Sequence, residues 1–350
     1  MPGEGRDVLG GAPTEPLVLV VGSDDRYAMP LAVTLHSALT RIPGEVPVRV
    51  HVFDGGISEG NRLRVQRVVR HARPTTALQW HVLDQNPLEG LRVVRWMTTA
   101  AYMRLLIPDI LEEEDIVVYL DSDLLVQADL SPLVREARRS PASAALAVGD
   151  FRHPDLGDVF GDRHCLALGV DPRGAYFNSG VLVIDVKGWR DLQVAERAIA
   201  FVRENASIMR YHDQDALNVV LAGRWKQLDP RWNVMLLKLE SYVAGEARSE
   251  YESDQMMRNL ATDAFIYHFI GPHKPWEGSY QGIARREYLQ ALRSAGWFQR
   301  DLESMFWRAK LAASTALWRA YRVLPKGIRS KIRSVARGGG SRDGGTPTLI

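Results

Sequence analysis

Two carboxylates, Asp121 and Asp123, follow directly after the apolar run at residues 116–120. The run is rich in β-branched residues and predicts a buried strand. Because a bare carboxylate is costly to bury, we expect the pair to leave the core at the end of this strand and to face a cation. Oxygen ligands favour hard ions such as Mg²⁺ or Mn²⁺, which assist reactions of phosphate-bearing substrates. The other interpretation is a solvated corner between a strand and a turn, where Asp and Ser are common.

A second segment, residues 268–276, combines residue types that suit a phosphate and a metal ion. His268 follows a strand predicted at residues 264–267, and together with the two carboxylates it makes a ligand set for Mn²⁺. Gly271 permits close approach of the backbone to a phosphate, and Lys274 supplies a positive charge. Each also has a simpler interpretation, His268 as a core or loop histidine and Lys274 as a solvated surface residue.

The bulk composition is that of an ordinary globular protein. The chain has 350 residues, 46% apolar and 25% charged, enough for one large α/β domain or two small ones. A net charge of +2 argues against a general nucleic-acid binder. The single Cys165 excludes an intramolecular disulfide and a zinc site built from several cysteines. The N-terminal residues lack the features of a signal peptide, and no segment is long and apolar enough to span a bilayer, so we expect a cytoplasmic protein.

Apolar runs alternate with amphipathic segments along the first half of the chain. Strands are predicted at residues 17–21, 48–53, 77–83, 116–120 and 144–148, and helices at residues 30–39, 61–70 and 98–107. This alternation predicts an α/β fold with a mostly parallel, doubly wound sheet, in which ligands bind at the carboxyl ends of the strands. Asp24 and Asp25 follow the first strand as Asp121 and Asp123 follow the fourth, so both groups are expected at that edge.

The second half of the chain is less regular. Residues 151–174 form a polar connection that is too long for a simple turn, and such loops are usually functional or disordered. The triplet Asn178-Ser179-Gly180 either opens the apolar run at residues 181–184 or forms only a turn before it. Helices are predicted around residues 195–202 and 214–221, and a short strand at residues 225–228.

Six segments, in order along the chain, resemble the retaining glycosyltransferases of family 8, the group that contains glycogenin and bacterial lipooligosaccharide galactosyltransferases. They are Gly22 to Tyr27, Ala101 to Leu105, Tyr119 to Asp123, Tyr176 to Leu182, His212 to Asn218 and His268 to Trp276. Each match is modest, but six in the family's order make coincidence a poor explanation.

The resemblance implies a GT-A fold over residues 17–300, with a Rossmann-like nucleotide-binding sheet fused to an acceptor-binding region. It implies a manganese ion, replaceable by Mg²⁺, with Asp121, Asp123 and His268 as its ligands. For a UDP-sugar donor it implies nucleotide and diphosphate contacts from Ser23, Asp24, Tyr27, Gly271 and Lys274, sugar contacts from Arg104, Asp123, Asn178 and Asp213, and Gln214 beneath the reacting face of the sugar.

Retention of configuration ordinarily suggests a carboxylate nucleophile and a covalent intermediate. The position that matches the family's residue beneath the sugar is the amide Gln214, which is a poor nucleophile. We therefore favour attack of the acceptor hydroxyl from the same face as the leaving group, with the departing phosphate taking the proton. Asp213 as a nucleophile is the alternative.

The C-terminal residues differ in composition from the rest. Residues 304–342 carry ten Lys or Arg and no Asp or Glu. Trp307, Leu311, Trp318 and Tyr321 recur at helical spacing beside basic residues, a pattern typical of helices that lie on an anionic membrane. The alternatives are a helix packed on the protein body with a charged outer face and, less favoured, a nucleic-acid-binding helix. We expect a basic amphipathic tail over residues 301–337, with a flexible leader at residues 1–16 and a disordered end at residues 338–350.

These features together predict a hexosyltransferase that moves galactose or glucose from a UDP-sugar to a glycan or a glycolipid such as a lipopolysaccharide core. The tail would place the protein on the inner face of the cell membrane. One alternative is a phosphatase of the haloacid dehalogenase type, but that class needs Thr or Val shortly after its second Asp, where this chain has Leu124 and Leu125. The others are a noncatalytic sugar-nucleotide or glycan-binding protein on the same fold, and a self-glucosylating enzyme like glycogenin.

Overall fold

The computed structural model describes residues 15–82, 88–91, 99–243, 254–298, 301–325 and 328–329. A seven-stranded sheet lies at its centre, in the order β3-β2-β1-β4-β7-β6-β8. The strands are β1 Leu17–Ser23, β2 Val48–Asp54, β3 Ala77–Val82, β4 Ile116–Leu120, β6 Ala145–Gly149, β7 Phe177–Asp185 and β8 Trp225–Gln227. The predicted α/β class and the parallel-rich sheet are confirmed.

One strand of this sheet, β7, runs against its neighbours. It pairs antiparallel with β4 and with β6, whereas the other neighbouring pairs are parallel. Leu120 at the carboxyl end of β4 pairs with Val181 in the middle of β7, so residues 177–180 extend past the end of β4. The residues that open β7 consequently lie at the same sheet edge as the residues that follow β1 and β4.

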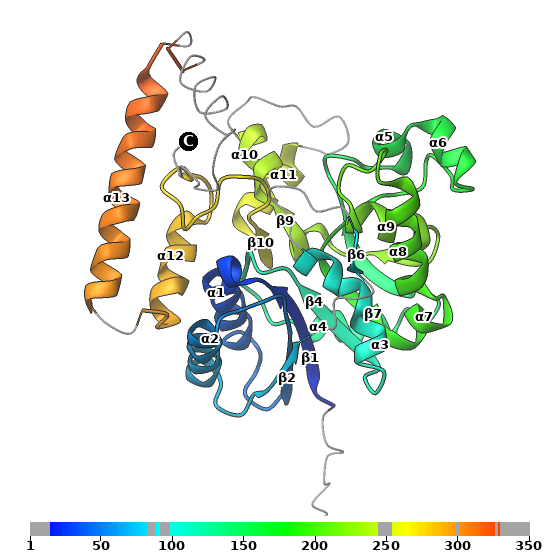
Figure 1. Cartoon of the computed structure of the whole chain (residues 1–350), viewed down its shortest axis with the longest axis horizontal. Helices are drawn as coiled ribbons and strands as arrows, with labels where there is room; N and C mark the ends of the chain where they lie inside the picture. The colour runs from blue at the N-terminus through cyan, green and yellow to red at the C-terminus, as the bar shows by residue number, and fades with distance from the viewer. Residues whose placement is uncertain are drawn as a thin grey trace, which may run out of the picture.

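Helices cover both faces of the sheet (Figure 1), with α1 and α2 on one side of the molecule and α7, α8 and α9 on the other. On β1, Leu19 and Val21 face the core that contains α1 and α2, and Val18 and Val20 face the second core. The helices are α1 Ala28–Leu39, α2 Glu59–Ala72, α3 Ile107–Ile110, α4 Ser131–Arg138, α5 Leu156–Phe160, α6 Asp162–Ala167, α7 Val186–Asp191, α8 Val194–Asn205, α9 Asp213–Val220, α10 Leu236–Val243, α11 Asp254–Thr262, α12 Arg285–Ser294 and α13 Asp301–Val323, with the 3-10 helices η1 Asp25–Tyr27, η3 Thr99–Leu106 and η4 Pro230–Asn233.

A second, three-stranded sheet joins distant parts of the chain. Its strands are β5 Leu124–Val126, β10 Ile266–His268 and β9 Val234–Met235, in the order β5-β10-β9. His268 pairs with Leu124 across the antiparallel pair. This register brings the end of β10 to the residues that follow β4.

Several local predictions need correction. The helix predicted at residues 98–107 is a 3-10 helix over residues 99–106, and Pro108 does not end the helical segment but lies in the first turn of α3, where a proline is tolerated. The triplet at residues 178–180 is part of β7 and not a turn before it. The connection at residues 151–174 contains α5 and α6. Strand β5 and helices α4, α10, α11 and α12 have no counterpart among the elements predicted from the sequence.

Helix α13 lies at the outer edge of the molecule, beyond α12 (Figure 1). Its Trp307 packs against Phe298 with ring centroids 5.2 Å apart. The pKa of Arg285 on α12 is lowered, first by burial and second by the positive charge of Arg319 on α13. The two helices therefore face each other. Among the helices that the structure describes, none combines the length and the apolar character needed to cross a bilayer. The predicted leader up to residue 14 and the predicted end at residues 338–350 lie outside the described residues.

Candidate functional site

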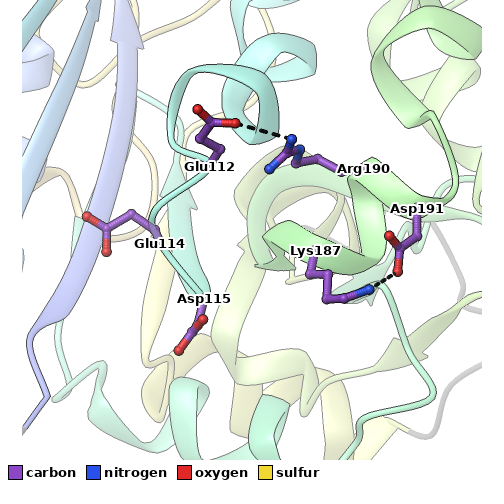
Figure 2. A pocket seen from close by; sticks show the side chains of 6 residues that line it. All are labelled: Glu112, Glu114, Asp115, Lys187, Arg190 and Asp191. Atoms are coloured by element: carbon purple, nitrogen blue, oxygen red, sulfur yellow. Dashed lines mark hydrogen bonds and ion pairs between the residues drawn. The ribbon is translucent and has the colours of Figure 1, made fainter.

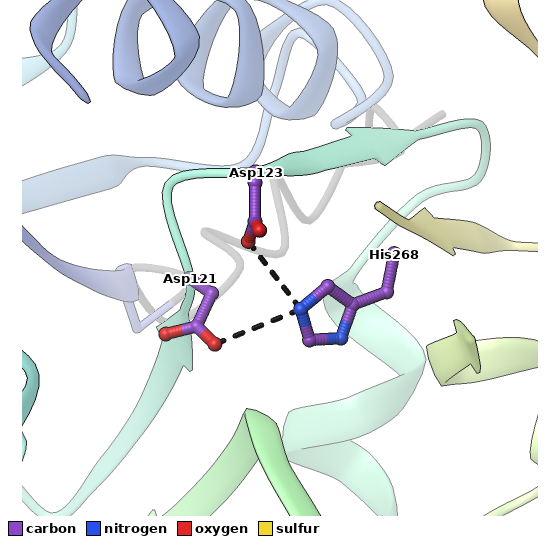
Figure 3. Close-up of side chains that lie close together, drawn as sticks. All are labelled: Asp121, Asp123 and His268. Carbon is purple, nitrogen blue, oxygen red and sulfur yellow. Dashed lines mark ion pairs between the residues drawn. The ribbon is translucent and has the colours of Figure 1, made fainter. Parts of the chain in front are cut away.

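The two carboxylates and the histidine singled out in the sequence converge. Figure 3 shows Asp121 and Asp123 pointing at the same ring nitrogen of His268. His268 Nε2 lies 3.7 Å from Asp121 Oδ2 and 3.3 Å from Asp123 Oδ1. One ligand atom from each residue lies within 4.8 Å of the others. Two carboxylate oxygens and an imidazole nitrogen are a donor set suited to a divalent cation such as Mn²⁺.

Gly180 makes room for this cluster. A Cβ at position 180 would lie 2.2 Å from His268 Cε1 and 2.9 Å from Asp121 Oδ2, distances that no side chain could accept. The carbonyl oxygen of Gly180 accepts a hydrogen bond of 2.9 Å from the backbone N–H of Asp121. Strand β7 can approach Asp121 so closely because residue 180 has no side chain.

Hydroxyl groups hold the turn between Asp121 and Asp123. The hydroxyl of Ser122 donates to the carbonyl of Gly22 at 2.7 Å, which ties the turn to the end of β1. The hydroxyl of Thr34 on α1 lies 3.0 Å from the carbonyls of both Ser122 and Leu124. The carboxylates are therefore positioned from two neighbouring elements and do not lie on a free loop.

Lys274 completes the polar lining on the side of Asp123. Its Nζ donates to Asp123 Oδ2 and to the carbonyl of Phe269, both at 2.6 Å, and it lies about 6 Å from the ring centroids of Tyr27 and Trp276. Burial opposes ionisation of Asp123, but Lys274 and His268 outweigh it and hold the pKa of this carboxyl well below its usual range. The pair is thus a buried positive charge beside an ionised carboxylate.

Arg104 links Asp121 to the other half of the site. Its Nη2 donates to Asp121 Oδ1 at 2.8 Å, and its Nε lies 3.1 Å from Asp213 Oδ2. Burial disfavours the charged guanidinium, yet Asp121 and Asp213 outweigh it and raise the pKa of Arg104. Burial raises the pKa of Asp213 to about 6, against the opposing effect of Arg104. Both carboxylate partners of Arg104 therefore belong to the site.

Gln214 is held at both ends of its amide. Its Oε1 accepts from Asn178 Nδ2 at 3.0 Å and from the backbone N–H of Ser179 at 3.1 Å. Its Nε2 donates to Asp150 Oδ2 at 3.2 Å and to the hydroxyl of Tyr176 at 3.1 Å. Gln214 is therefore fixed in orientation.

The remaining predicted site residues lie at the margins of the cluster. Ser23 is buried at the end of β1, and its hydroxyl donates to the carbonyl of Asp24 at 3.0 Å. Asp24 caps η1 by accepting from the N–H of Tyr27 at 3.2 Å. Gly271 has a φ of +89°, a conformation that favours glycine, and packs near Leu237. Among the hydrogen bonds and ion pairs of the described residues, none joins Ser23, Asp24 or Gly271 to the metal-ligand cluster.

Sequence reasoning missed other residues that hold the site. Gly180 lies inside one of the six segments that resemble the family. A glycine directly after the polar residues Asn178 and Ser179 was a signal that could have identified it. Asn233 and Asp150 are buried and bonded to site residues, Asn233 to Asn178 and Asp150 to Gln214. A lone Asn or Asp before or after a strand carries no such signal, since its partners are distant in sequence.

A separate hollow lies at the opposite end of β4. Figure 2 shows its lining residues, Glu112, Glu114, Asp115, Lys187, Arg190 and Asp191. Asp115 precedes β4, whereas the metal-ligand carboxylates follow it. Arg190 pairs with Glu112 at 3.2 Å, and Lys187 pairs with Asp191. Two pairs of opposite charge therefore line this hollow, which lies away from the candidate site.

Comparisons with known proteins agree with this geometry. Residues 18–279 match the profile of the family described as glycosyl transferase family 8. General stress protein A of Bacillus subtilis is 32% identical over 287 residues, which cover 80% of this chain and 94% of that protein. The lipopolysaccharide 1,3-galactosyltransferase of Salmonella typhimurium is 23% identical over 284 residues, which cover 80% of this chain and 78% of that protein.

The same likeness extends to solved structures. The galactosyltransferase LgtC, in complex with donor and acceptor sugar analogues, has 27% sequence identity and a TM-score of 0.65, covering 84% of this chain and 100% of that one. The structure of an active-site variant of LgtC has a TM-score of 0.67 at 26% identity, covering 79% of this chain and 96% of that one. The fold is therefore GT-A, and the chain belongs to glycosyl transferase family 8.

Proposed function

We propose that this glycosyltransferase moves a hexose, galactose or glucose, from a UDP-sugar to a hydroxyl of a glycan or glycolipid, with retention of configuration and with Mn²⁺ as its cofactor. The observation that carries the proposal is the convergence of two groups of charged and polar side chains at one sheet edge. Asp121, Asp123 and His268 form one group, and Arg104 joins it to Asp213 in the other.

The metal ligands fit a diphosphate-bearing donor. A divalent ion bound by Asp121, Asp123 and His268 would stabilise the negative charge that develops on UDP as the bond to the sugar breaks. Lys274 supports the same role, since it is buried beside Asp123 and is held there by two hydrogen bonds. Mg²⁺ is the substitute that an oxygen-rich site would accept.

The nucleotide would lie at the end of β1. Ser23, Asp24 and Tyr27 are the proposed contacts to the uracil and ribose, and Gly271 and Lys274 are the proposed contacts to the diphosphate. The ring of Tyr27 meets that of Trp276 edge-on at 5.8 Å, so the segment after β1 and the segment of Lys274 are in contact. This contact supports one continuous binding surface for the nucleotide.

The hexose would lie between the metal ligands and α9. Arg104, Asn178, Asp213 and Asp123 are the proposed partners of its hydroxyl groups, and Gln214 would lie beneath its reacting face. Asp213 opens α9 after His212, whose φ of +49° is strained for a residue other than glycine. Such strain often accompanies a functional position.

The proposed reaction is a front-face displacement. The bond between the anomeric carbon and the phosphate oxygen breaks, the acceptor oxygen forms the new bond from the same face, and its proton passes to the departing phosphate. The amide of Gln214 supports this mechanism, because it accepts and donates hydrogen bonds at both ends and offers no carboxylate. Asp213 is a weaker candidate nucleophile because it is paired with Arg104. A glycosylated Asp213 peptide trapped by mass spectrometry would replace our mechanism with the covalent one.

We further propose that α13 attaches the enzyme to the inner face of the cell membrane, where a lipid-linked acceptor would be reached. Trp307, Leu311 and Trp318 lie on its half-buried side, whereas the large apolar side chains Phe306 and Leu317 are exposed. The one helix thus packs on the body and also offers an apolar surface flanked by basic residues. Removal of residues 302–350 should release the protein from membranes and leave donor hydrolysis intact; unchanged membrane binding would refute this role.

The decisive test is a panel of UDP-sugars, assayed for hydrolysis with and without Mn²⁺ and with a lipid-linked glycan acceptor. We expect turnover of UDP-galactose or UDP-glucose that requires the metal, and loss of this turnover in Asp121→Asn and Asp123→Asn without loss of the folded state. No turnover of any donor would favour a noncatalytic sugar-nucleotide-binding protein. Undiminished activity in the two variants would refute the metal site.

A further inference from the structure

A buried amide connects the metal-ligand histidine to the sugar side of the site. Asn233 ends η4 and is 0% exposed. Its side chain lies between His268, whose Nδ1 is 2.9 Å from Asn233 Oδ1, and Asn178, whose Oδ1 is 2.8 Å from Asn233 Nδ2. Two amides and one imidazole are thus in series, and each has an orientation that hydrogen bonding must decide.

Backbone groups decide the orientation of the first amide. The N–H of Gly180 can only donate, and it lies 3.0 Å from Asn178 Oδ1, so that atom must be the oxygen. At its other end, Asn178 Nδ2 meets Gln214 Oε1, which also accepts from the backbone N–H of Ser179. Two backbone donors therefore require the same orientation of Asn178.

The orientation then passes along the series. Because Asn178 presents an oxygen to Asn233, the atom of Asn233 that faces it must be the NH₂ group. Asn233 consequently turns its own oxygen toward His268 Nδ1. An oxygen that can only accept requires a proton on Nδ1, and in the neutral ring this leaves Nε2 without one.

The requirement matters because the other neighbours of the ring favour the opposite tautomer. Nε2 faces two carboxylates, at 3.3 Å and 3.7 Å, and in the absence of a metal ion a carboxylate attracts the proton to the nitrogen that it faces. A metal ion needs Nε2 with its lone pair free. The ring must therefore be held in the ligand form against the preference of its own carboxylate neighbours.

We propose that Asn233 is a positioning residue that keeps His268 protonated on Nδ1, and that its orientation is imposed by the Gly180 N–H through Asn178. The role of His268 as a ligand rests on the proposed function. The tautomer itself does not, so it can be measured in the metal-free protein.

The first measurement is long-range ¹H–¹⁵N NMR of the histidine ring nitrogens in the metal-free protein, with His268 assigned by comparison with His268→Gln. We expect the Nδ1–H form in the native chain, a shift toward the Nε2–H form in Asn233→Ala, and retention of Nδ1–H in Asn233→Asp, which keeps an oxygen acceptor. Asn218→Ala is the matched control, since Asn218 is an equally buried amide that bonds to Phe177 and Gln214 rather than to His268. It should leave the tautomer unchanged.

The second measurement is Mn²⁺ binding followed by EPR of the free ion. Loss of a group that orients a metal-ligating histidine costs about 10- to 100-fold in affinity, and we expect this loss in Asn233→Ala and its partial rescue in Asn233→Asp. An Nε2–H tautomer in the native chain would overturn the proposal, even if Asn233→Ala failed to fold. Two results for Mn²⁺ binding would also overturn it. One is an equal affinity in all variants, and the other is an equal loss of affinity in both Asn233 variants while the Nδ1–H form persists. A native chain with the Nδ1–H form but no affinity for Mn²⁺ would instead refute the proposed metal function.

Discussion

The sheet edge of the candidate metal site, with Asp121, Asp123 and His268, and helix α13 place their side chains by opposite rules. At the edge, charged and polar groups are buried, with His268 3% and Arg104 6% exposed. On α13, apolar groups are exposed, with Phe306 72% and Val323 83% exposed. Each region reverses the ordinary preference of apolar residues for the interior and charged residues for water.

The reversal has a different physical basis in each region. At the edge, every charge discussed has a partner of opposite sign within 4 Å, and backbone donors fix the amides between them. Such a cluster resists change, because loss of one partner leaves another buried and unpaired. On α13 the exposed side chains have few neighbours, so a substitution there should affect binding to other surfaces far more than folding.

The largest effect is expected at Gly180. Gly180→Ala adds a Cβ against His268 and Asp121, which must move apart. Since misplacement of reacting groups by about 1 Å costs roughly 100-fold in rate, we expect at least that loss in Mn²⁺-dependent donor hydrolysis. Gly60→Ala on α2 is the matched control, because nothing lies within 4 Å of its added Cβ. Activity of Gly180→Ala close to that of the control would show that the edge is looser than its contacts imply.

The next effect is expected on the exposed side of α13. Phe306→Glu with Leu317→Glu should reduce binding to anionic lipid vesicles about tenfold, the order expected when a large apolar side chain no longer enters the lipid. Donor hydrolysis should not change. The control is Leu63→Glu, an equally exposed apolar position on α2. Vesicle sedimentation at low and high salt measures lipid binding of the double variant and of the control. Unchanged binding of the double variant would contradict a membrane role for α13.

A smaller effect concerns the pH dependence of stability. The folded-state pKa of Asp213, about 6, lies above its ordinary value of 3.8, because burial disfavours the carboxylate. The folded protein thus holds this proton more tightly, so the contribution of Asp213 to the free energy of unfolding falls as pH rises from 3.8 to about 6 and stays low above that. Asp213→Asn has no such proton to lose.

Urea unfolding at about pH 4.5 and about pH 8 tests this expectation. The stability of Asp213→Asn relative to the native chain should be more favourable at the higher pH, while donor turnover is lost at both. The same relative stability at both pH values would mean that Arg104 offsets the burial of Asp213 completely.

The last effect is expected where α13 meets the body, and it concerns stability rather than activity or binding. A Cβ at Gly278 would lie 2.4 Å from the side chain of Ser314 and 2.5 Å from the backbone nitrogen of Thr315. Gly278→Ala should therefore push α13 outward, at a cost of about 1–3 kcal/mol in the free energy of unfolding, typical of overpacking. Limited proteolysis should cut α13 faster, whereas Ser314→Ala, which adds no atoms, should not change the rate. Equal proteolysis of the two variants would show that α13 does not pack closely there.

Several strands and the residues of the candidate metal site could be found in the sequence because their signals are local. β-branched runs marked β1, β2 and β4, and the carboxylates that follow β4 stand beside one such run. The His268 strand was found for the same reason. The reversed direction of β7 could not be predicted, since it depends on which neighbours pair with it and not on its own residues.

The remaining parts of the site depend on contacts between distant segments. Gly180 and Asn233 both lie beside His268, which is 88 and 35 residues further along the chain. Asp150 bonds to Gln214, which is 64 residues further along. Tertiary structure also decided that α13 packs its Trp307 side on the body and leaves Phe306 exposed.

The sequence by itself determined which residue types stand at the candidate site, and the elements that end at those residues. Only the tertiary structure decided the pairing of Arg104 with two carboxylates and the series from Gly180 to His268. The physical reason is range. Strand formation follows from neighbouring residues, whereas the orientation of a buried amide or imidazole follows from whichever donors and acceptors the folded chain places around it.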